Sequence, residues 1–277
     1  ERSVESIINQ TYQNIEIIII DDKSNDGSYE LLKKLYSSND KIKILQNNEN
    51  IGLTENCNKI FNLSSGKYFF WNAQDDFRDN TYIAKCLDKM EKYPNASLCN
   101  SYTAVFYKDP KKIMHINNLN SLENNKKILS RYWSLLRNYN DVNIYGFMRS
   151  SLLKKTNLWL PINGSANNLL FELLLLGEFI QIKEDLFFYS GQSMYDRPTP
   201  EEEYNRQSRK RKFFRYPFVS LAVNQIKSIC RKKNNLHIKF LLIILVIIDS
   251  FFVNLGKLIF RVLNLFFDEK KIPKFII

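Results

Sequence analysis

Two pairs of adjacent aspartates are the residues of this sequence whose types and spacing best suit chemistry. Asp21 and Asp22 follow a run of isoleucines, and Asp75 and Asp76 follow a short aromatic run. Neighbouring carboxylates can bind a divalent cation, accept hydrogen bonds from a ligand or act as a general base. A second interpretation stays open for each pair, because an aspartate after a strand also caps the turn or helix that follows.

Other kinds of site have little support in the sequence. The four cysteines form no C-x-x-C pair, and the two histidines, His115 and His237, lie far apart. These counts argue against a zinc knuckle, a disulfide framework and a histidine-built metal centre. Neither G-x-G-x-x-G after a strand nor G-x-x-x-x-G-K-[ST] occurs, which argues against dinucleotide oxidoreductases and P-loop nucleotidases. Any metal here is therefore expected on carboxylates.

The elements that must position the two aspartate pairs alternate between strand and helix. Short apolar runs predict strands over 16–20, 41–46, 68–71 and 96–102, and amphipathic stretches predict helices over 29–36, 56–63 and 81–93. This rhythm predicts an α/β fold with a mostly parallel sheet and flanking helices. In such sheets ligands bind beyond the carboxyl ends of the strands, where both aspartate pairs are expected.

The remaining chain divides into a second half-domain and a tail. We predict one domain over 1–200, with halves 1–110 and 111–200, followed by a basic and apolar helical tail over 201–277. Further predicted elements are a helix over 127–137, a strand leading into a helix over 143–156, an apolar helix over 168–176, and short strands over 179–182 and 186–189. The opening residues predict a helix that no strand precedes, so we expect an N-terminal strand to be missing.

Several ordered blocks of the sequence resemble family 2 glycosyltransferases of the GT-A (Rossmann-like) fold. The blocks are SIINQTYQNIEIIIIDDKSNDGS, NIG followed by Asn56 and Asn58, SGKYFFWNAQDD, GFMRSSLLKKT, and LLFELLLLGEF with IKEDLFFY behind it. The third block resembles a bacterial subgroup whose metal motif reads W-x-x-x-D-D. Together the blocks cover about residues 1–190.

The resemblance implies a site that binds a nucleotide-diphospho-sugar together with Mg²⁺ or Mn²⁺. It implies that Asp21 or Asp22, with Asp22 preferred, contacts the nucleotide base, that Asp75 binds the cation, and that Asp76 orients the loop or the sugar. Donor-site positions also match at Asn50, Asn56 and Asn58. Ala73 stands where the family's first motif aspartate would be, so a common ribose contact is lost.

The resemblance also implies an inverting transfer with an aspartate as general base, and here the sequence departs from the family. The base position falls on Ala166, followed by Asn167 and Asn168. The nearest carboxylate along the chain is Glu172, which we name as the candidate base, although a glutamate inside a helix more often serves the helix face. Alanine at position 166 thus puts the expected activity in doubt.

Charge and apolar runs in the tail predict a membrane surface as a partner. The chain of 277 residues has a net charge of +11, and basic clusters in the tail alternate with runs such as FLLIILVII. Apolar helices lying in the membrane interface, with basic residues on anionic headgroups, explain this pattern best. A spanning helix is opposed by Asp249, and packing onto the domain or a partner subunit stays open. Nucleic acid is not an expected partner, because no recognition element accompanies the basic residues.

These expectations combine into one function and one alternative. The first is an inverting, metal-dependent glycosyltransferase of cell-envelope polysaccharide biosynthesis. It would act on a glycan or lipid-linked acceptor at the cytoplasmic face of the cell membrane, as a peripheral or tail-anchored protein. The alternative is a catalytically silent GT-A domain that serves as a membrane-associated binding or scaffold subunit.

Overall fold

The computed structural model describes residues 1–107, 109–116, 127–137, 141–162, 164–191, 217–232 and 235–266. Two compact units divide the chain, Glu1–Phe213 and Phe214–Ile277. The predicted boundary at residue 200 and the charged stretch from Glu201 to Arg215 lie outside the described residues.

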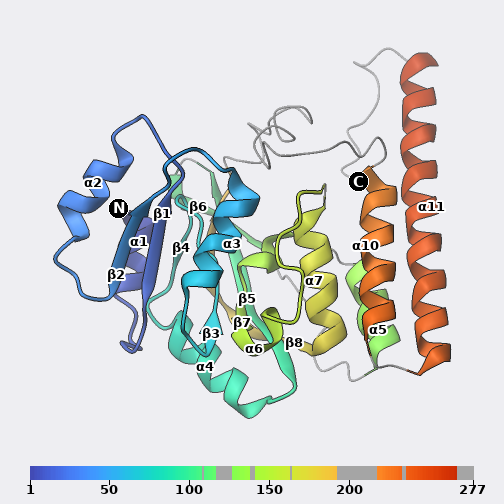
Figure 1. The fold of residues 1–277 in the computed structure, drawn as a ribbon, viewed down its shortest axis with the longest axis horizontal. Coiled ribbons are helices and arrows are strands. Elements are labelled where there is room, and N and C mark those ends of the chain that lie inside the picture. The colour runs from blue at the N-terminus through green and yellow to red at the C-terminus, as the bar shows by residue number, and fades with distance from the viewer. Residues whose placement is uncertain are drawn as a thin grey trace. The chain divides into compact units, whose positions relative to one another are not determined.

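A parallel pair of strands forms the first part of the larger unit. Strand β1 (Ile17–Asp21) pairs with β2 (Ile42–Gln46) in register from Ile17–Ile42 to Asp21–Gln46. Helices α2 (Ser28–Tyr36) and α3 (Leu53–Leu63) flank the pair (Figure 1). The β-branched run of β1 suits a strand between two layers, and it brings Asp21 to the carboxyl end of the strand.

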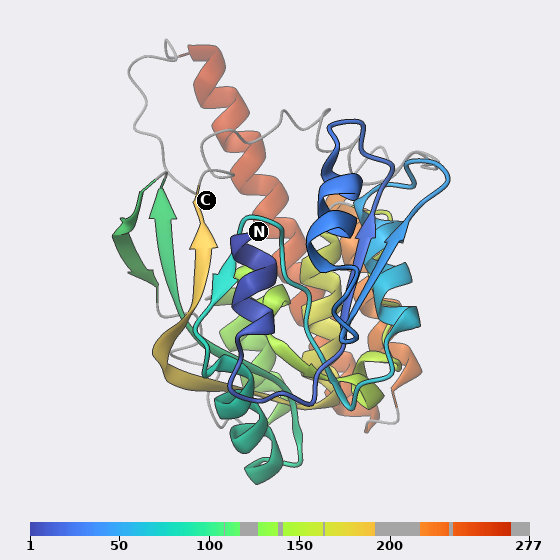
Figure 2. The ribbon, with the colours of Figure 1, turned by 90° about the vertical axis from the view of Figure 1, so that its left-hand side faces the viewer.

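A six-stranded sheet forms the rest of the larger unit. Its path runs β3-β7-β5-β8-β4, with β6 paired to β5. The strands are β3 (Tyr68–Phe69), β4 (Phe77–Arg78), β5 (Ala96–Tyr107), β6 (Asp109–Ile116), β7 (Phe147–Arg149) and β8 (Glu178–Ser190). Figure 2 shows the long strands β5 and β8 running together through this sheet.

The α/β class was predicted correctly, but the direction of the strands needs a correction. Among the described strands, β1–β2 and β5–β8 are parallel, whereas β3–β7, β5–β7, β5–β6 and β4–β8 are antiparallel. The six-stranded sheet is therefore mixed rather than mostly parallel. The antiparallel pairings could not be predicted from the sequence, because β4 and β7 are only two and three residues long.

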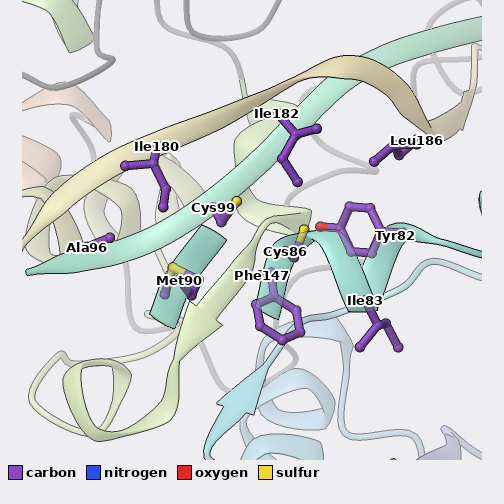
Figure 3. Close-up of a cluster of buried hydrophobic side chains, with 10 residues drawn as sticks. All are labelled: Tyr82, Ile83, Cys86, Met90, Ala96, Cys99, Phe147, Ile180, Ile182 and Leu186. Atoms are coloured by element: carbon purple, nitrogen blue, oxygen red, sulfur yellow. The ribbon is translucent and has the colours of Figure 1, made fainter. Parts of the chain in front are cut away.

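Helix α4 (Tyr82–Lys92) closes the core over this sheet. Its buried residues Tyr82, Ile83, Cys86 and Met90 recur at intervals of one, three and four residues, which gathers them on one face. Figure 3 shows the cluster that they form with Ala96, Cys99, Phe147, Ile180, Ile182 and Leu186 from β5, β7 and β8. Cys86, Cys99 and Ile180 are fully buried, so this packing fixes the central strands.

Short helical elements and one apolar helix complete the described part of the larger unit. They are α1 (Arg2–Ile8), α5 (Ile128–Arg137), the 3₁₀ turn η1 (Asp141–Tyr145), α6 (Ser150–Leu153) and α7 (Ser165–Leu176). Helix α7 is buried at every position from Asn168 to Leu175, as expected for a helix that is apolar on all sides. It begins at Ser165, three residues before the predicted start.

The smaller unit contains two helices that pack against each other. Helix α10 (Pro217–Arg231) is followed by α11 (Leu236–Phe266), which is 31 residues long. The Lys239 ammonium of α11 donates to the backbone oxygen of Cys230 at 2.9 Å. In the part of the chain that the structure describes, no helix combines the length and the apolarity needed to cross a membrane.

Candidate active site

Asp22 lies just past the carboxyl end of β1 and accepts three hydrogen bonds. The Asn47 side-chain amide and the backbone N–H of Ile51 donate to Oδ1, each at 2.8 Å, and the backbone N–H of Gly52 donates to Oδ2 at 2.8 Å. Gly52 has φ = +86°, which glycine adopts without strain. The carboxylate therefore fixes the loop between β2 and α3, and Asn50, which is exposed, lies in this loop.

Asn56 belongs to the same network. Its side-chain amide donates to the backbone oxygen of Ile20 at 3.1 Å, and its oxygen accepts from Asn47 at 3.1 Å. Lys59 donates to the Asn47 oxygen at 2.6 Å. Asn47, which is 3% exposed, was not predicted as a site residue, although its place directly after β2 is the signal that could have identified it.

Asp21 is buried and closes the turn that follows β1. The backbone N–H of Ser24 and the side-chain amide of Gln46 each donate to its Oδ2 at 3.0 Å. Burial opposes ionisation, but the hydrogen bonds from Ser24 and Gln46 outweigh it and lower the pKa of Asp21. These contacts are those of a turn cap.

The turn that Asp21 closes contains a backbone outlier. Lys23 has φ = +61° and is exposed. The left-handed region costs a residue with a Cβ about 1–2 kcal/mol. The strained residue is therefore the first one after Asp22.

Asp75 and Asp76 lie between β3 and β4 and differ sharply in environment. Asp75 is exposed, whereas Asp76 has no exposed surface. The backbone N–H of Ser190, at the end of β8, donates to Asp76 Oδ1 at 2.9 Å, while Oδ2 is buried and has no hydrogen-bond partner in the described part of the chain. Burial raises the pKa of Asp76 to about 7, against a smaller lowering by the Ser190 bond.

Arg78 is a buried cation that was not predicted from the sequence. Its guanidinium donates to the Asn72 side-chain oxygen at 2.9 Å and to the backbone oxygens of Trp71 at 3.2 Å and Tyr145 at 2.8 Å. It also lies over the rings of Phe70, Tyr82 and Phe187, 4.2–4.5 Å from their centroids. Its contacts join the 71–76 loop to the turn before β7, so it stabilises the loop of Asp75 from within.

Trp71, the tryptophan of the W-x-x-x-D-D block, is a core residue. Its indole N–H donates to the backbone oxygen of Cys57 in α3 at 3.1 Å. Its ring meets those of Phe69 and Trp159 edge-on, with centroids 4.8 and 5.7 Å apart. It therefore anchors the end of β3 to α3.

Asn58 and Glu172 both hold the segment that precedes α7. Asn58 exchanges two hydrogen bonds with the Trp159 backbone, at 2.9 and 3.0 Å. The Glu172 carboxylate is 3% exposed and accepts from the backbone N–H of Asn157 at 2.6 Å, from the Asn157 side-chain amide, and from Asn168 at 3.4 Å. Glu172 is thus already engaged in bonds that hold the 157–159 segment against α7.

The residue at the expected base position lies in the first turn of α7. Ala166 and Asn167 are half-buried, and Gly164, the N-cap that precedes the helix, has φ = +74°. The Ser165 hydroxyl accepts from the backbone N–H of Leu160 at 2.7 Å. The alanine side chain at position 166 has no group that can accept a proton.

The donor set fits a divalent cation that is held jointly by protein and ligand. Within the described ranges, no three His, Cys, Asp or Glu side chains lie close enough to form a metal site by themselves. Mg²⁺ commonly takes one or two carboxylates and completes its shell with waters and substrate phosphates. Exposed Asp75, on a loop fixed by buried Asp76, has the chemistry of such a single carboxylate ligand.

Solved structures with this fold include sugar-nucleotide complexes. Staphylococcus aureus TarS (residues 1–349) in complex with UDP-GlcNAc matches with a TM-score of 0.65 at 12% identity, over 90% of this chain and 68% of that one. The mannosyltransferase PcManGT of Pyrobaculum calidifontis, in complex with GDP-Man and Mn²⁺, matches with a TM-score of 0.53 at 10% identity, over 88% and 63% of the two chains. At these identities the likeness establishes the GT-A fold.

Curated relatives match about a third of the sequence. An uncharacterized glycosyltransferase of Haemophilus influenzae is 35% identical over 105 residues, which is 38% of this chain and 32% of the relative. The Escherichia coli UDP-Glc:alpha-D-GlcNAc-diphosphoundecaprenol beta-1,3-glucosyltransferase WfaP is 35% identical over 89 residues, 32% of this chain and 35% of that protein. The matches thus span about a third of each relative's length.

The family profile described as "Glycosyl transferase family 2" matches residues 1–155, which is more than half of the chain and includes both aspartate pairs. The chain therefore belongs to family 2 of the glycosyltransferases, and the resemblance that was read from its sequence is confirmed.

Proposed function

We propose that this chain transfers a sugar from a nucleotide-diphospho-sugar to a hydroxyl group of a glycan or lipid-linked acceptor, with inversion and with Mg²⁺ or Mn²⁺ at Asp75. The observation that carries the proposal is the contrast between exposed Asp75 and buried Asp76 in the loop between β3 and β4. The UDP-GlcNAc complex of TarS, the GDP-Man and Mn²⁺ complex of PcManGT and the glucosyltransferase activity in the name of WfaP support it.

In this proposal each aspartate has its own task. A cation at Asp75 would supply positive charge against the charge that develops on the leaving diphosphate. Asp76 accepts the Ser190 N–H and so ties the loop of Asp75 to the end of β8. Asp75 thereby holds its ligand from a fixed backbone.

The donor nucleotide is proposed to bind at the carboxyl ends of β1 and β2. Asp22 and Asn56 contribute through the loop that they fix, and exposed Asn50 is free to contact the ligand. Asp21 supports the turn behind them. Asn58 acts one step away, through the Trp159 backbone.

The assignment of the general base stays a prediction. Glu172 is the candidate along the chain, but its carboxylate accepts bonds from Asn157 and Asn168, which favours a positioning role. Deprotonation of the acceptor by a general base contributes about 10²–10⁴ to a rate. A chain without such a base is expected to turn over slowly or not at all.

A turnover assay tests the proposal. The full chain is incubated with Mn²⁺, a panel of UDP- and GDP-sugars and polyprenyl-diphosphate-linked saccharides, and release of the nucleotide is followed. We expect release that depends on both acceptor and metal and that is lost in Asp75→Ala. Release that is equally fast in Asp75→Ala and in the wild-type chain would contradict the assignment of Asp75.

The second candidate function is a catalytically silent GT-A domain that binds a donor at the membrane. Ala166 at the base position and the engaged carboxylate of Glu172 favour it. Metal-dependent binding of a sugar nucleotide without turnover on any acceptor of the panel would support this function. Turnover with any acceptor would exclude it.

We further propose that α11 places the protein peripherally on an anionic membrane, at the cytoplasmic face. Up to Phe251, where the description of its side chains ends, the large exposed apolar residues of α11 are Leu236, Phe240, Leu241, Ile247, Ile248 and Phe251. At about 100° per residue they fall within about 140° of the helix circumference. Leu242 and Val246, which are buried, lie on the other side, as does Asp249.

Charge supports an anionic lipid surface as the occupant of this face. The basic residues between Pro217 and Phe266 are Lys227, Arg231, Lys232, Lys233, Lys239, Lys257 and Arg261, against a single acidic residue, Asp249. Each basic residue near an anionic surface contributes about 1 kcal/mol to binding. Amphipathic helices of this composition bind in the plane of the interface.

Flotation with vesicles tests this proposal. We expect the chain to float with phosphatidylglycerol vesicles, less so at high salt, and Phe240→Ser/Ile247→Ser to stay at the bottom. The control Leu31→Ser/Leu35→Ser changes two exposed leucines of α2. Equal flotation of the α11 variant and the wild-type chain would contradict the proposal.

A further inference from the structure

The first turn of α1 lies against the loop that carries Asp75. The Ser3 hydroxyl donates to the backbone oxygen of Ala73 at 2.8 Å and accepts from the Asn72 side-chain amide at 2.8 Å. Ser3 is only 8% exposed. One buried hydroxyl thus satisfies two polar groups of a segment that belongs to no strand.

Arg2 holds the same loop two residues further on. Its guanidinium donates to the backbone oxygen of Asp75 at 3.2 Å. The group also lies over the rings of Phe77 and Phe106, 4.8 and 4.7 Å from their centroids. These rings restrict where the guanidinium can lie, so the bond to Asp75 has a defined direction.

The residues that follow α1 fix the other side of the loop. The Gln10 side-chain amide donates to the backbone oxygen of Asp79 at 2.6 Å, and the backbone N–H of Thr11 donates to that of Asn80 at 2.8 Å. The Gln10 side-chain oxygen accepts from the backbone N–H of Ile83, at the start of α4, at 2.9 Å. Contacts from residues 2–11 therefore span the whole 72–80 segment.

We propose that Arg2 and Ser3 are positioning residues for the cation site, because they fix the backbone of Asp75 and of the two residues that lead to it. The inference rests on the proposed role of Asp75 as the cation ligand. Neither residue touches the cation. Each sets the position from which the Asp75 carboxylate reaches it, as the residues around a metal site generally do.

The experiment measures Mn²⁺ affinity by electron paramagnetic resonance of free Mn²⁺ in the presence of saturating UDP. It compares the wild-type chain with Ser3→Ala and Arg2→Met, each checked for its unfolding temperature. We expect Mn²⁺ affinity to fall about 10-fold or more in both variants. Arg2→Lys, which keeps the charge and one donor, is expected to recover part of the loss.

Two variants serve as matched controls. Ser6→Ala removes a hydroxyl of the same helix that, among the described residues, donates to the backbone oxygen of Ser3 at 2.7 Å and makes no bond to the 72–80 segment. Lys33→Met removes a cation that lies over the ring of Tyr29 in α2, at 5.2 Å. Both controls are expected to keep the wild-type Mn²⁺ affinity within about twofold.

The outcomes separate this inference from the proposed function. If the wild-type chain binds Mn²⁺ with UDP and the folded Ser3→Ala and Arg2→Met variants bind it equally well, the positioning role is wrong and the function stands. A lower unfolding temperature with unchanged Mn²⁺ affinity would contradict the positioning role in the same way. If the wild-type chain binds no Mn²⁺ with UDP, nor with GDP when the titration is repeated with that nucleotide, both the cation site and its positioning fail.

Discussion

At the scale of single residues, adjacent carboxylates in this protein perform different tasks because their surroundings differ. Asp21 closes a turn and Asp22 fixes a loop, although they share one strand end. Asp75 is exposed while Asp76 is buried against the end of β8. In each pair, at least one carboxylate accepts backbone N–H groups and so fixes the loop near which a ligand could bind.

Burial of Asp76 predicts an unusual dependence of stability on pH. Its folded pKa is about 7, raised from 3.8 by burial, so the folded state binds more protons than the unfolded state between pH 4 and 7. The contribution of Asp76 to stability is therefore fully present below pH 4 and is lost as the pH rises through 7. The loss over this whole pH range is on the order of 4 kcal/mol.

Urea unfolding of the metal-free wild-type chain and of Asp76→Asn, at pH 5 and pH 8, measures this effect. The stability of the wild-type chain relative to the variant is expected to fall from pH 5 to pH 8. Asp88→Ala, which removes an exposed carboxylate of α4, should show no such change relative to the wild-type chain. A stability difference between Asp76→Asn and the wild-type chain that is independent of pH would refute the assignment.

The left-handed backbone of Lys23 predicts a stabilising substitution. Lys23→Gly is expected to raise the free energy of unfolding by about 1 kcal/mol, because glycine adopts φ = +61° without a Cβ clash. Urea unfolding measures it, and Lys34→Gly, inside helix α2, should instead cost about 1 kcal/mol. A loss of stability in Lys23→Gly would show that contacts of the lysine outweigh the strain.

At the scale of elements, the 157–159 segment before α7 links helix α3 to helix α7. The Asn58 side-chain amide of α3 donates a hydrogen bond to the backbone oxygen of Trp159. The Glu172 carboxylate of α7 accepts one from the backbone N–H of Asn157, two residues before Trp159. Leu158 between them has φ = +55°, so the surrounding contacts hold a strained backbone in place. Glu172 is thereby assigned a structural task that a general base would not need.

Glu172→Gln separates the two roles of this residue. A positioning role predicts that the free energy of unfolding of the variant falls by about 2 kcal/mol. The reason is that Asn157 donates to both carboxylate oxygens of Glu172, and in the variant one of these N–H groups would face an amide NH₂, which cannot accept a hydrogen bond. It also predicts that, at temperatures at which both proteins are folded, the kcat of the variant stays within about tenfold of the wild-type value. Were Glu172 the base, kcat would fall about 10²-fold or more in folded protein. Unfolding curves and initial rates on the same samples measure both quantities.

The elements that could be predicted from the sequence are those with a clear local pattern. The isoleucine run of β1 and the apolar face of α4 are examples, and both were predicted within one residue. Strand β8 was predicted as two short strands, because Lys183, Glu184 and Asp185 interrupt its apolar run. In the structure the pairing with β5 shifts at this point, from Ser101–Ile182 to Tyr102–Asp185, and one strand continues through an irregularity.

The elements that were missed carry no local pattern. Strand β4 is only Phe77–Arg78, and β6 begins with Asp109 and Pro110, which favour a turn. The contacts of Ser190 with Asp76, of Arg78 with Tyr145, and of Arg2 with Asp75 join residues far apart in the chain. Such contacts arise only once the sheet is assembled, so the aspartates could be named from the sequence but their supports could not.

At the scale of the whole molecule, a family 2 glycosyltransferase unit is followed by a unit of two helices. The family match ends at residue 155, so α7, β8 and the helical unit lie beyond it. The departure from the family pattern that the sequence predicts at Ala166, and the candidate base Glu172, lie in this second part. Donor binding and turnover are therefore expected to depend on different parts of the chain and can be tested separately.

The central claim is that Asp75 holds the cation through which the donor diphosphate binds. Calorimetric titration of UDP and of GDP into the full chain, with Mn²⁺ and with EDTA, tests it most directly. The account predicts that at least one nucleotide binds with Mn²⁺, that EDTA abolishes this binding, and that Asp75→Ala weakens it about 10-fold or more while Asp88→Ala does not. Binding by Asp75→Ala with wild-type affinity, or nucleotide binding that EDTA leaves unchanged, would contradict it.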